Sequence, residues 1–355
     1  MHVPDGFIDI PVSAAAGVVA AGAVAVSLRG ARRELGGAGG HLGERTAPLA
    51  GLVAAFVFAV QMLNFPVAAG TSGHLLGGAL AAILVGPYTG VLCISVVLLL
   101  QGVLFADGGL TALGVNILLM GVVTVVVAYT LFRALVRVLP KKRRSVTIAT
   151  FVAALVSVPA SAVAFTLLYA IGGTTDVPIG TVLGAMTGVH LLIGIGEAVI
   201  TAATVGAVLA VRPDLVHGAR GLSAPLKLRV DGELVDARPE AAPEPAVSPR
   251  PVLLAGLVIS LILAGFVSFY ASADPDGLER VAADKGIDKK VEDHAAADSP
   301  LADYGVGGIE NARVSGGLAG AIGVGATLVV GTGVFIVVRR RRGDGAEAEK
   351  ESVRG

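Results

Sequence analysis

The segment from residue 46 to residue 106 reads TAPLAGLVAAFVFAVQMLNFPVAAGTSGHLLGGALAAILVGPYTGVLCISVVLLLQGVLFA. It contains no Asp, Glu, Lys or Arg, and its single histidine is His74. A helix needs about 20 apolar residues to cross the hydrocarbon core of a bilayer. Backbone groups in hydrocarbon must satisfy their own hydrogen bonds, so a segment of this kind is expected to form spanning helices. The run therefore predicts an all-α integral membrane protein.

The composition of the whole chain supports the same class. The 355 residues are 54% hydrophobic and 15% charged, whereas soluble domains carry about 25% charged residues. This balance excludes an ordinary cytosolic enzyme, a disordered protein and a nucleic-acid-binding protein, so no nucleic-acid partner is expected. The single cysteine, Cys93, excludes a disulfide framework and cysteine-rich metal sites.

Charged residues are confined to the connections between apolar runs. The charge pattern predicts nine spans, of which the third is the shortest: 10–28, 48–66, 73–87, 88–106, 111–132, 146–171, 181–211, 251–272 and 317–338. Basic connections face the cytoplasm, and basic clusters lie in residues 29–45, 133–144 and 339–342. We therefore expect a multi-pass protein of the cytoplasmic membrane with its N-terminus outside and its C-terminus inside.

Two polar segments divide the chain into domains. Residues 213–250 are rich in Pro, Ala and charge and predict a cytoplasmic linker. Residues 274–313 contain ten acidic and five basic residues and predict an outside loop. The expected organisation is a seven-helix domain over residues 1–212, the linker 213–250, a two-helix hairpin over 251–338 that carries the acidic loop, and a basic, disordered tail over 339–355.

The N-terminus offers a metal chelate. We expect Met1 to be retained, because residues 1–5 lack the basic region of a signal peptide. The Met1 amine, the His2 amide nitrogen and the His2 imidazole can surround an ion in one plane, and square-planar nitrogen coordination is diagnostic of Ni²⁺ or Cu²⁺. By the expected topology His74 lies at the same outer face. It supplies the fourth nitrogen or is a packing residue.

Other polar residues at membrane depth are candidates because burying them in lipid is costly. They are Gln61, Asn64, Ser72, Asn116, His190 and Glu197. Gln61 and Asn64 share a helix face and either orient a metal ligand or hold helices together. His190 and Glu197 are seven residues apart, which is roughly 10 Å along a helix. They cannot both bind one ion, and helix–helix hydrogen bonding or contact with a partner subunit is the alternative.

Four separated motifs resemble the M subunits of cobalt/nickel energy-coupling-factor (ECF) importers. They are MHVPDGF at 1–7, NFPVAAGTSGHLLG at 64–77, ADGGLTALG at 106–114 and HLLIGIGEA at 190–198. The hairpin contains PDGLE at 275–279 and SPLADYG at 299–305, and it resembles the small N subunit of the same systems. The chain thus resembles a fusion of a CbiM/NikM-type M subunit with a PDGLE-type N subunit.

The resemblance implies a substrate-specific component that captures Ni²⁺ or Co²⁺ at the outer face for ATP-driven uptake. It implies Met1, His2 and His74 as metal ligands and no permanent cofactor. It also implies two kinds of partner, a transmembrane coupling (T) subunit and cytoplasmic ATPases. No Gly-Lys pair occurs in the chain, so the phosphate-binding loop of an ATPase is absent. We therefore expect a transporter subunit rather than an enzyme.

Two other functions remain open at this point. Gly70-Thr71-Ser72-Gly73 satisfies the G-x-S-G pattern of rhomboid intramembrane serine proteases, with His190 as the possible base. Rhomboids place a glycine three residues after the histidine, where this chain has Ile193. The other alternative is a metal channel or carrier that works without ATP.

Overall fold

The computed structural model describes residues 1–36, 46–68, 70–220, 227–230, 233–236 and 250–352, with side chains up to residue 220 and over 250–339. Within these residues, seven helical segments are long and apolar enough to cross a membrane. They are α1 (Ile10–Gly36), α4 (Pro87–Leu104), α5 to α6 (Leu113–Val138), α7 (Arg143–Gly172), α8 (Ile179–Val211), α9 with η5 (Arg250–Tyr270) and the first part of α11 (Ala312–Arg339). The chain is a multi-pass membrane protein of the all-α class.

Two shorter apolar helices lie inside the bundle. α2 (Thr46–Gln61) has 16 residues, most of them buried, and α3 (Gly78–Val85) has eight residues, all of them buried. At 1.5 Å per residue α3 is about 12 Å long, which is less than half of a bilayer core. The expectation of a spanning helix over 73–87 is therefore wrong, and with it the count of nine spanning helices over the described residues.

The chain leaves the helical conformation between α2 and α3. β1 (Phe65–Ala68) and β2 (Thr71–Gly73) pair as a small antiparallel hairpin, and the helix expected over 48–66 ends at Gln61. His74 precedes α3 by four residues instead of beginning it. Non-helical backbone at membrane depth is tolerated only where protein buries it or a cavity adjoins it. The segment before α3 is buried in this way. The carboxylate of Glu197 on α8 accepts hydrogen bonds from the segment's backbone amides at Leu76 and Gly77.

The C-terminal hairpin packs its two helices, α9 (Arg250–Gly265) and α11 (Ala312–Ser352), against each other and against α2. The two helices approach each other closely at Gly320, where a Cβ atom would lie 2.4 Å from the carbonyl oxygen of Ala264. The connection between them contains α10 (Gly277–Lys285), η6 (Asp288–Lys290) and η7 (Ala302–Tyr304). α10 packs against α8, so the connection lies across the end of the bundle.

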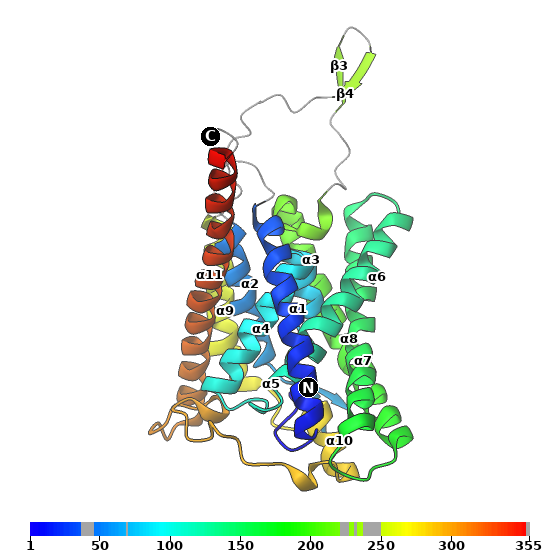
Figure 1. Ribbon diagram of the computed structural model, residues 1–355, viewed down its shortest axis with the longest axis vertical. Helices are drawn as coiled ribbons and strands as arrows, with labels where there is room; N and C mark the ends of the chain where they lie inside the picture. The colour runs from blue at the N-terminus through cyan, green and yellow to red at the C-terminus, as the bar shows by residue number, and fades with distance from the viewer. Residues whose placement is uncertain (37–45, 69, 221–226, 231–232, 237–249, 353–355) are drawn as a thin grey trace.

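Figure 1 shows how the ends of the bundle differ. The N-terminus and the connection with α10 lie at one end, and the far ends of α1, α6 and α11 lie at the other. The basic residues at the ends of α1, α6 and α11 therefore lie at the end of the bundle opposite to the N-terminus. The expected linker over 213–250 contains η3 (Pro213–Leu215), η4 (His217–Ala219) and a second hairpin, β3 (Lys227–Val230) and β4 (Glu233–Asp236), and the rest of it lies largely outside the described residues.

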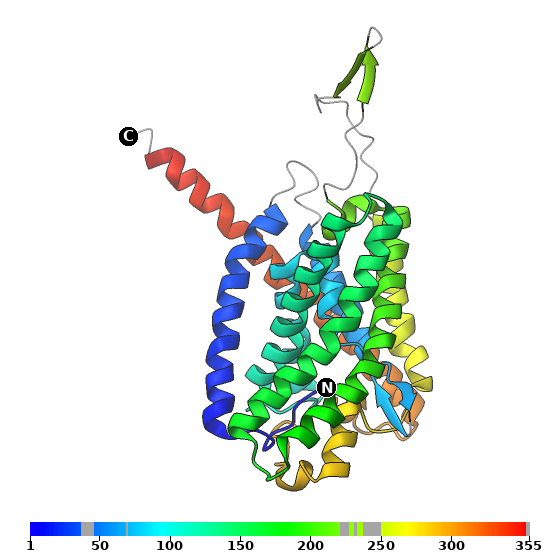
Figure 2. The same ribbon diagram turned by 90° about the vertical axis from the view of Figure 1, so that its right-hand side faces the viewer.

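The tail differs from the expectation. α11 continues as a helix to Ser352, whereas a disordered tail was expected from residue 339 onward. The sequence AEAEKE at 346–351 explains the difference, because Ala, Glu and Lys are among the residues with the highest helix propensity. Figure 2 shows this helix extending away from the bundle.

Candidate metal centre

The first five residues are threaded into the end of the bundle and tied there through the backbone. The amide of Val3 donates to Oδ1 of Asn116 at 2.7 Å, and Nδ2 of Asn116 donates to the carbonyl of Val3 at 3.0 Å. Asn116 is the last residue of α5, directly before the π-helical segment η2 (Ile117–Val123), and such segments are frequent at functional sites. The Asp5 carboxylate accepts from the backbone amides of Leu110 (3.1 Å) and Thr111 (2.8 Å).

The side chain of Met1 anchors the terminus itself. Met1 is 2% exposed, and its sulfur lies 3.5 Å from Oγ of Ser161 on α7. The terminal nitrogen is consequently fixed inside the protein rather than left in solvent. An ammonium group buried in this way needs partners, because burying an unpaired charge is expensive.

The Met1 nitrogen has two partners. It lies 2.5 Å from Nε2 of His74 and 2.7 Å from Oδ2 of Asp276. Nδ1 of His74 lies 3.0 Å from the carbonyl oxygen of Leu75 and therefore carries the proton, which leaves a lone pair on Nε2 toward the amine. Burial alone would raise the pKa of the Asp276 carboxyl, but the Met1 ammonium and His74 hold it well below its usual range.

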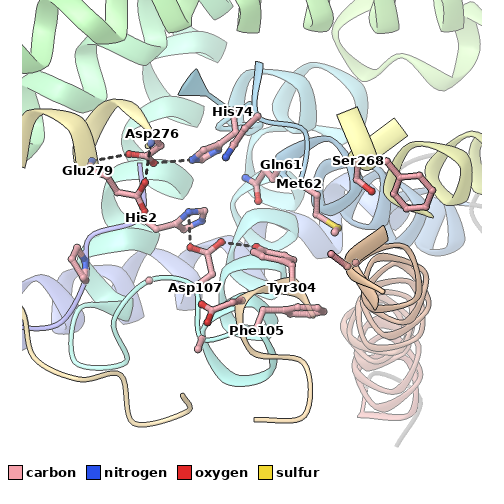
Figure 3. A pocket seen from close by; sticks show the side chains of 18 of the residues that line it. His2, Gln61, Met62, His74, Phe105, Asp107, Ser268, Asp276, Glu279 and Tyr304 are labelled. Atoms are coloured by element: carbon pink, nitrogen blue, oxygen red, sulfur yellow. Dashed lines mark hydrogen bonds and ion pairs between the residues drawn. The ribbon is translucent and has the colours of Figure 1, made fainter. Parts of the chain in front are cut away.

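His2 lies beside this group. Its ring stacks on that of His74, with centroids 5.0 Å apart and planes 13° from parallel. Nδ1 of His2 lies 3.1 Å from Oδ1 of Asp107, and Nε2 is buried without a partner. Burial lowers the pKa of His2 to about 4, against the opposing effect of Asp107, so the imidazole is neutral near pH 7. Figure 3 shows the two imidazoles between Asp276 and Asp107.

The C-terminal hairpin supplies two of the side chains that orient these groups. Asp276 begins α10 in a capping box, in which Oδ1 accepts from the amides of Leu278 (2.7 Å) and Glu279 (2.9 Å) while Glu279 accepts from the amide of Asp276 (2.8 Å). The hydroxyl of Tyr304 donates to Oδ2 of Asp107 at 2.5 Å. Burial and the neighbouring Asp107 raise the pKa of Tyr304 well above its usual value, so this hydroxyl is a donor.

Side chains of α2 and α8 hold the loop that carries His74 by hydrogen bonds to its backbone. Nε2 of Gln61 donates to the carbonyl of Leu76 at 2.9 Å, and Glu197 accepts from the amides of Leu76 and Gly77. Gly77 has φ +87°, and a Cβ there would lie 2.6 Å from Val57. The segment after His74 is thus fixed at both its carbonyl and its amide groups.

The structure brings together some of the sequence-predicted candidates and separates others. Met1, His2 and His74 meet at one point, and Gln61, Asn116 and Glu197 hold the segments that carry them. Within the part of the chain that the structure describes, the one hydrogen bond of the His190 side chain is within its own helix, with the carbonyl of Met186 at 2.8 Å, and a Cβ atom at Gly277 would lie 3.4 Å from its ring. Asn64 and Ser72 contact the C-terminal helical hairpin. The carbonyl of Asn64 accepts from the amide of Ser272, and the hydroxyl of Ser72 donates to the carbonyl of Asp274 at 2.7 Å.

The rhomboid alternative is therefore wrong. The Ser72 hydroxyl is committed to a backbone carbonyl, and Nε2 of His190 has no partner, so the two do not form a nucleophile–base pair.

Asp107, Asp276 and Tyr304 are the site residues that sequence reasoning missed. Asp107 and Asp276 lie in motifs that were singled out, ADGGL and PDGLE, and the pattern D-x-x-E of Asp276 and Glu279 signals a helix start. Among the described residues no three His, Cys, Asp or Glu side chains gather in a way that could hold a metal ion.

Comparison with known proteins agrees with this arrangement. Residues 2–215 match the family described as cobalt uptake substrate-specific transmembrane region (CbiM), and residues 250–340 match the PDGLE domain. A putative metal transport protein of Haloquadratum walsbyi is 41% identical over 216 residues, which is 61% of this chain and 93% of that protein. A putative fused nickel transport protein NikMN of Archaeoglobus fulgidus is 36% identical over 61% of this chain and 68% of its own length.

A solved structure supports the same relationship. The crystal structure of a truncated transition metal transporter superposes with a TM-score of 0.50 at 27% identity, over 59% of this chain and 99% of that one. The relatives are metal transport proteins, in agreement with a transporter subunit rather than an enzyme. The chain belongs to the CbiM family of cobalt and nickel transport components, with a PDGLE domain fused behind its transmembrane region.

Proposed function

We propose that this chain captures Ni²⁺ or Co²⁺ at the outer face of the membrane and is the substrate-specific component of an ECF-type importer. The observation that carries the proposal is the 2.5 Å separation between the Met1 nitrogen and Nε2 of His74, with the His2 ring stacked beside them. Two nitrogens on adjacent corners of a square around a metal, each bonded at about 2.0 Å, are about 2.8 Å apart. The two groups therefore need little movement to share an ion.

The four nitrogens would come from three residues. Met1 supplies its amine, His74 supplies Nε2, and His2 supplies its amide nitrogen and Nδ1. In the structure Nδ1 of His2 bonds Asp107, so chelation requires the ring to leave that carboxylate and to carry its proton on Nε2 instead of Nδ1. Four metal–nitrogen bonds form as water leaves the ion, and the ammonium and the amide each release one proton to solvent. A planar set with a deprotonated amide favours Ni²⁺ over Co²⁺.

Uptake then depends on other chains. The sequence of this chain carries no phosphate-binding loop, so ATP hydrolysis belongs to cytoplasmic ATPases, coupled through a transmembrane subunit. A relative from Rhodobacter capsulatus, 44% identical over 135 residues, which is 37% of this chain and 36% of that protein, is named as a fused nickel transport protein NikMN. That relationship favours nickel as the cargo of this chain and the fusion as the form in which both parts act.

The test is a change at the terminus that leaves every side chain in place. Adding one alanine before Met1 converts the amine to an amide, and we expect it to abolish Ni²⁺ binding measured by calorimetry on the full chain in detergent. His74→Ala should do the same, and an alanine added after Gly355 is the matched control that should retain binding. Unchanged Ni²⁺ affinity in the N-terminally extended protein would overturn the proposal.

The ATP-independent carrier makes a different prediction. In vesicles that contain this chain with its partner subunits, depletion of ATP should stop nickel uptake while leaving binding intact. Uptake that continues without ATP would favour the carrier.

A further inference from the structure

A partly open cavity of about 620 Å³ adjoins the metal centre. It lies between the bundle and the C-terminal hairpin, and its inner wall includes His2 and His74. Its lining contains four carboxylates, those of Asp107, Asp276, Glu279 and Asp303, and one arginine, Arg313, so acidic groups are in excess. Figure 3 shows the inner part of the cavity, with Gln61 and Met62 from the end of α2 on one side and Tyr304 opposite.

One polar atom of this wall lacks a partner. Gln61 is 4% exposed, and its Nε2 is held by the carbonyl of Leu76, which fixes the orientation of the amide. Its Oε1 is left buried without a hydrogen bond. A buried carbonyl without a hydrogen bond is unfavourable, and because Gln61 lines the cavity, this oxygen needs a donor from inside it.

The backbone of the same wall is held in a conformation that side chains disfavour. Among the described residues three that are not glycine have a positive φ: Ala106 (54°), Asp303 (51°) and Tyr304 (56°). All three line the cavity. Strain of this kind persists where the surrounding structure imposes it, and it gathers at functional sites.

We propose that this cavity is an entry vestibule in which the hydrated divalent cation rests before capture, with Oε1 of Gln61 accepting hydrogen bonds from its coordinated waters. The inference rests on the proposed function and adds to it a site that precedes the nitrogen ligands. Water molecules bound to a dication are strong hydrogen-bond donors, so they can supply the hydrogen bond that Oε1 of Gln61 lacks. The carboxylates supply the negative potential that concentrates a cation in a cleft.

The size of the cavity fits this occupant. Six waters occupy about 180 Å³ at about 30 Å³ each, so the hydrated ion fits within 620 Å³ with its shell complete. The ion would meet oxygen acceptors first and nitrogen donors at the inner wall, where the shell is exchanged for His2, His74 and the Met1 amine.

The experiment measures the rate at which Ni²⁺ associates with the full-length protein, by stopped-flow competition with a metallochromic chelator. Gln61→Leu and Gln61→Glu both lose the donor to Leu76, and they differ in whether an oxygen faces the cavity. We expect Gln61→Leu to slow association about tenfold while Gln61→Glu keeps at least the wild-type rate. Equal slowing in both variants would mean that Gln61 acts only through the His74 loop, and it would overturn the vestibule.

A second pair of variants tests whether the negative charge of the cavity wall speeds the association of Ni²⁺. Asp303→Asn removes an acid from the wall, and Asp298→Asn removes one from the same connection outside it. We expect Asp303→Asn to slow association severalfold at low salt, an effect that added salt should screen, and Asp298→Asn to change little. Equal effects would show that only the net charge of the connection matters and would contradict the proposal. Wild-type protein that binds no Ni²⁺ would refute the proposed function instead, so the two failures are distinguishable.

Discussion

The Met1 ammonium and the Asp276 carboxylate form an ion pair of 2.7 Å that joins residues 275 positions apart in the chain. Both groups are nearly inaccessible to solvent, with side-chain exposures of 1% and 10%. The pair connects the start of the CbiM region to the first turn of α10 in the PDGLE domain. The fused domain therefore touches the proposed metal ligands directly.

Asp276→Asn tests this pair, because asparagine still caps α10 but leaves the ammonium without its counter-charge. Removing one partner of a buried ion pair costs about 3–5 kcal/mol, so we expect the N-terminal segment to detach for a larger fraction of the time. The readout is the rate at which an amine-reactive reagent labels Met1, compared with the wild-type protein. The exposed Asp298→Asn variant should label at the wild-type rate. A protected Met1 amine in Asp276→Asn would show that the ion pair does not hold the terminus.

Much of the fold follows from where charged residues are absent, and the segment between α2 and α3 is the main exception. Spanning helices such as α8 are predicted because an uncharged run in lipid has no alternative to a helix. The segment between α2 and α3 also lacks charged residues, yet its described residues are not helical. Its strands β1 and β2 pair with each other, and Glu197 and Gln61 satisfy backbone groups of Leu76 and Gly77. Such tertiary hydrogen bonds leave no periodic signal in the sequence.

The candidate metal centre could also be predicted only in part, because some of its contacts form only when distant segments pack together. The group of Met1, His2 and His74 could be predicted, because chelate chemistry links the first two residues and the expected topology places His74 at the same outer face. Asp276 and Tyr304 lie in the PDGLE and SPLADYG motifs, but nothing in those motifs indicates that the two side chains contact the N-terminal site until α10 and η7 are packed against the bundle. The polar partners of His74 depend on that packing.

Proton release on binding distinguishes the planar nitrogen site from simple ion pairing. The ammonium of Met1 and the His2 amide each lose one proton to the metal, whereas His2, with a pKa of about 4, is already neutral at pH 7. Binding that releases two protons strengthens as pH rises, by about 100-fold per pH unit while both groups are protonated in the free protein. Calorimetry of Ni²⁺ binding in buffers of different ionisation enthalpy measures this number. A value near zero would exclude a deprotonated amide among the ligands.

Glu197→Gln should weaken nickel binding although Glu197 touches no ligand. The carboxylate accepts from two amides, and a glutamine offers one oxygen and turns its NH₂ toward the second amide. Outer partners of metal ligands are typically worth 10–100-fold in affinity, and we expect a loss in that range. Glu34 provides a matched control, since its carboxylate accepts from the amides of Tyr88 and Thr89 at the opposite end of the bundle. Glu34→Gln should lower thermal stability without changing the Kd for Ni²⁺, and an equal loss of affinity in both variants would reduce Glu197 to a general structural role.

Gly6→Ala tests whether the N-terminal turn positions the amine. Gly6 has φ +88°, and a Cβ there would lie 2.0 Å from the carbonyl oxygen of Lys290, so an alanine must displace backbone as well as adopt a disfavoured conformation. Gly70 also has a positive φ, +69°, but its Cβ would meet no atom within 4 Å, so Gly70→Ala carries only the conformational cost of about 1–2 kcal/mol. We expect Gly6→Ala to lower Ni²⁺ affinity at least tenfold more than Gly70→Ala, measured on folded protein of matched helical content. Because neither glycine contributes a ligand, a difference between them would come from the position of the Met1 amine, and equal affinities would mean that the ion itself can draw the terminus into place.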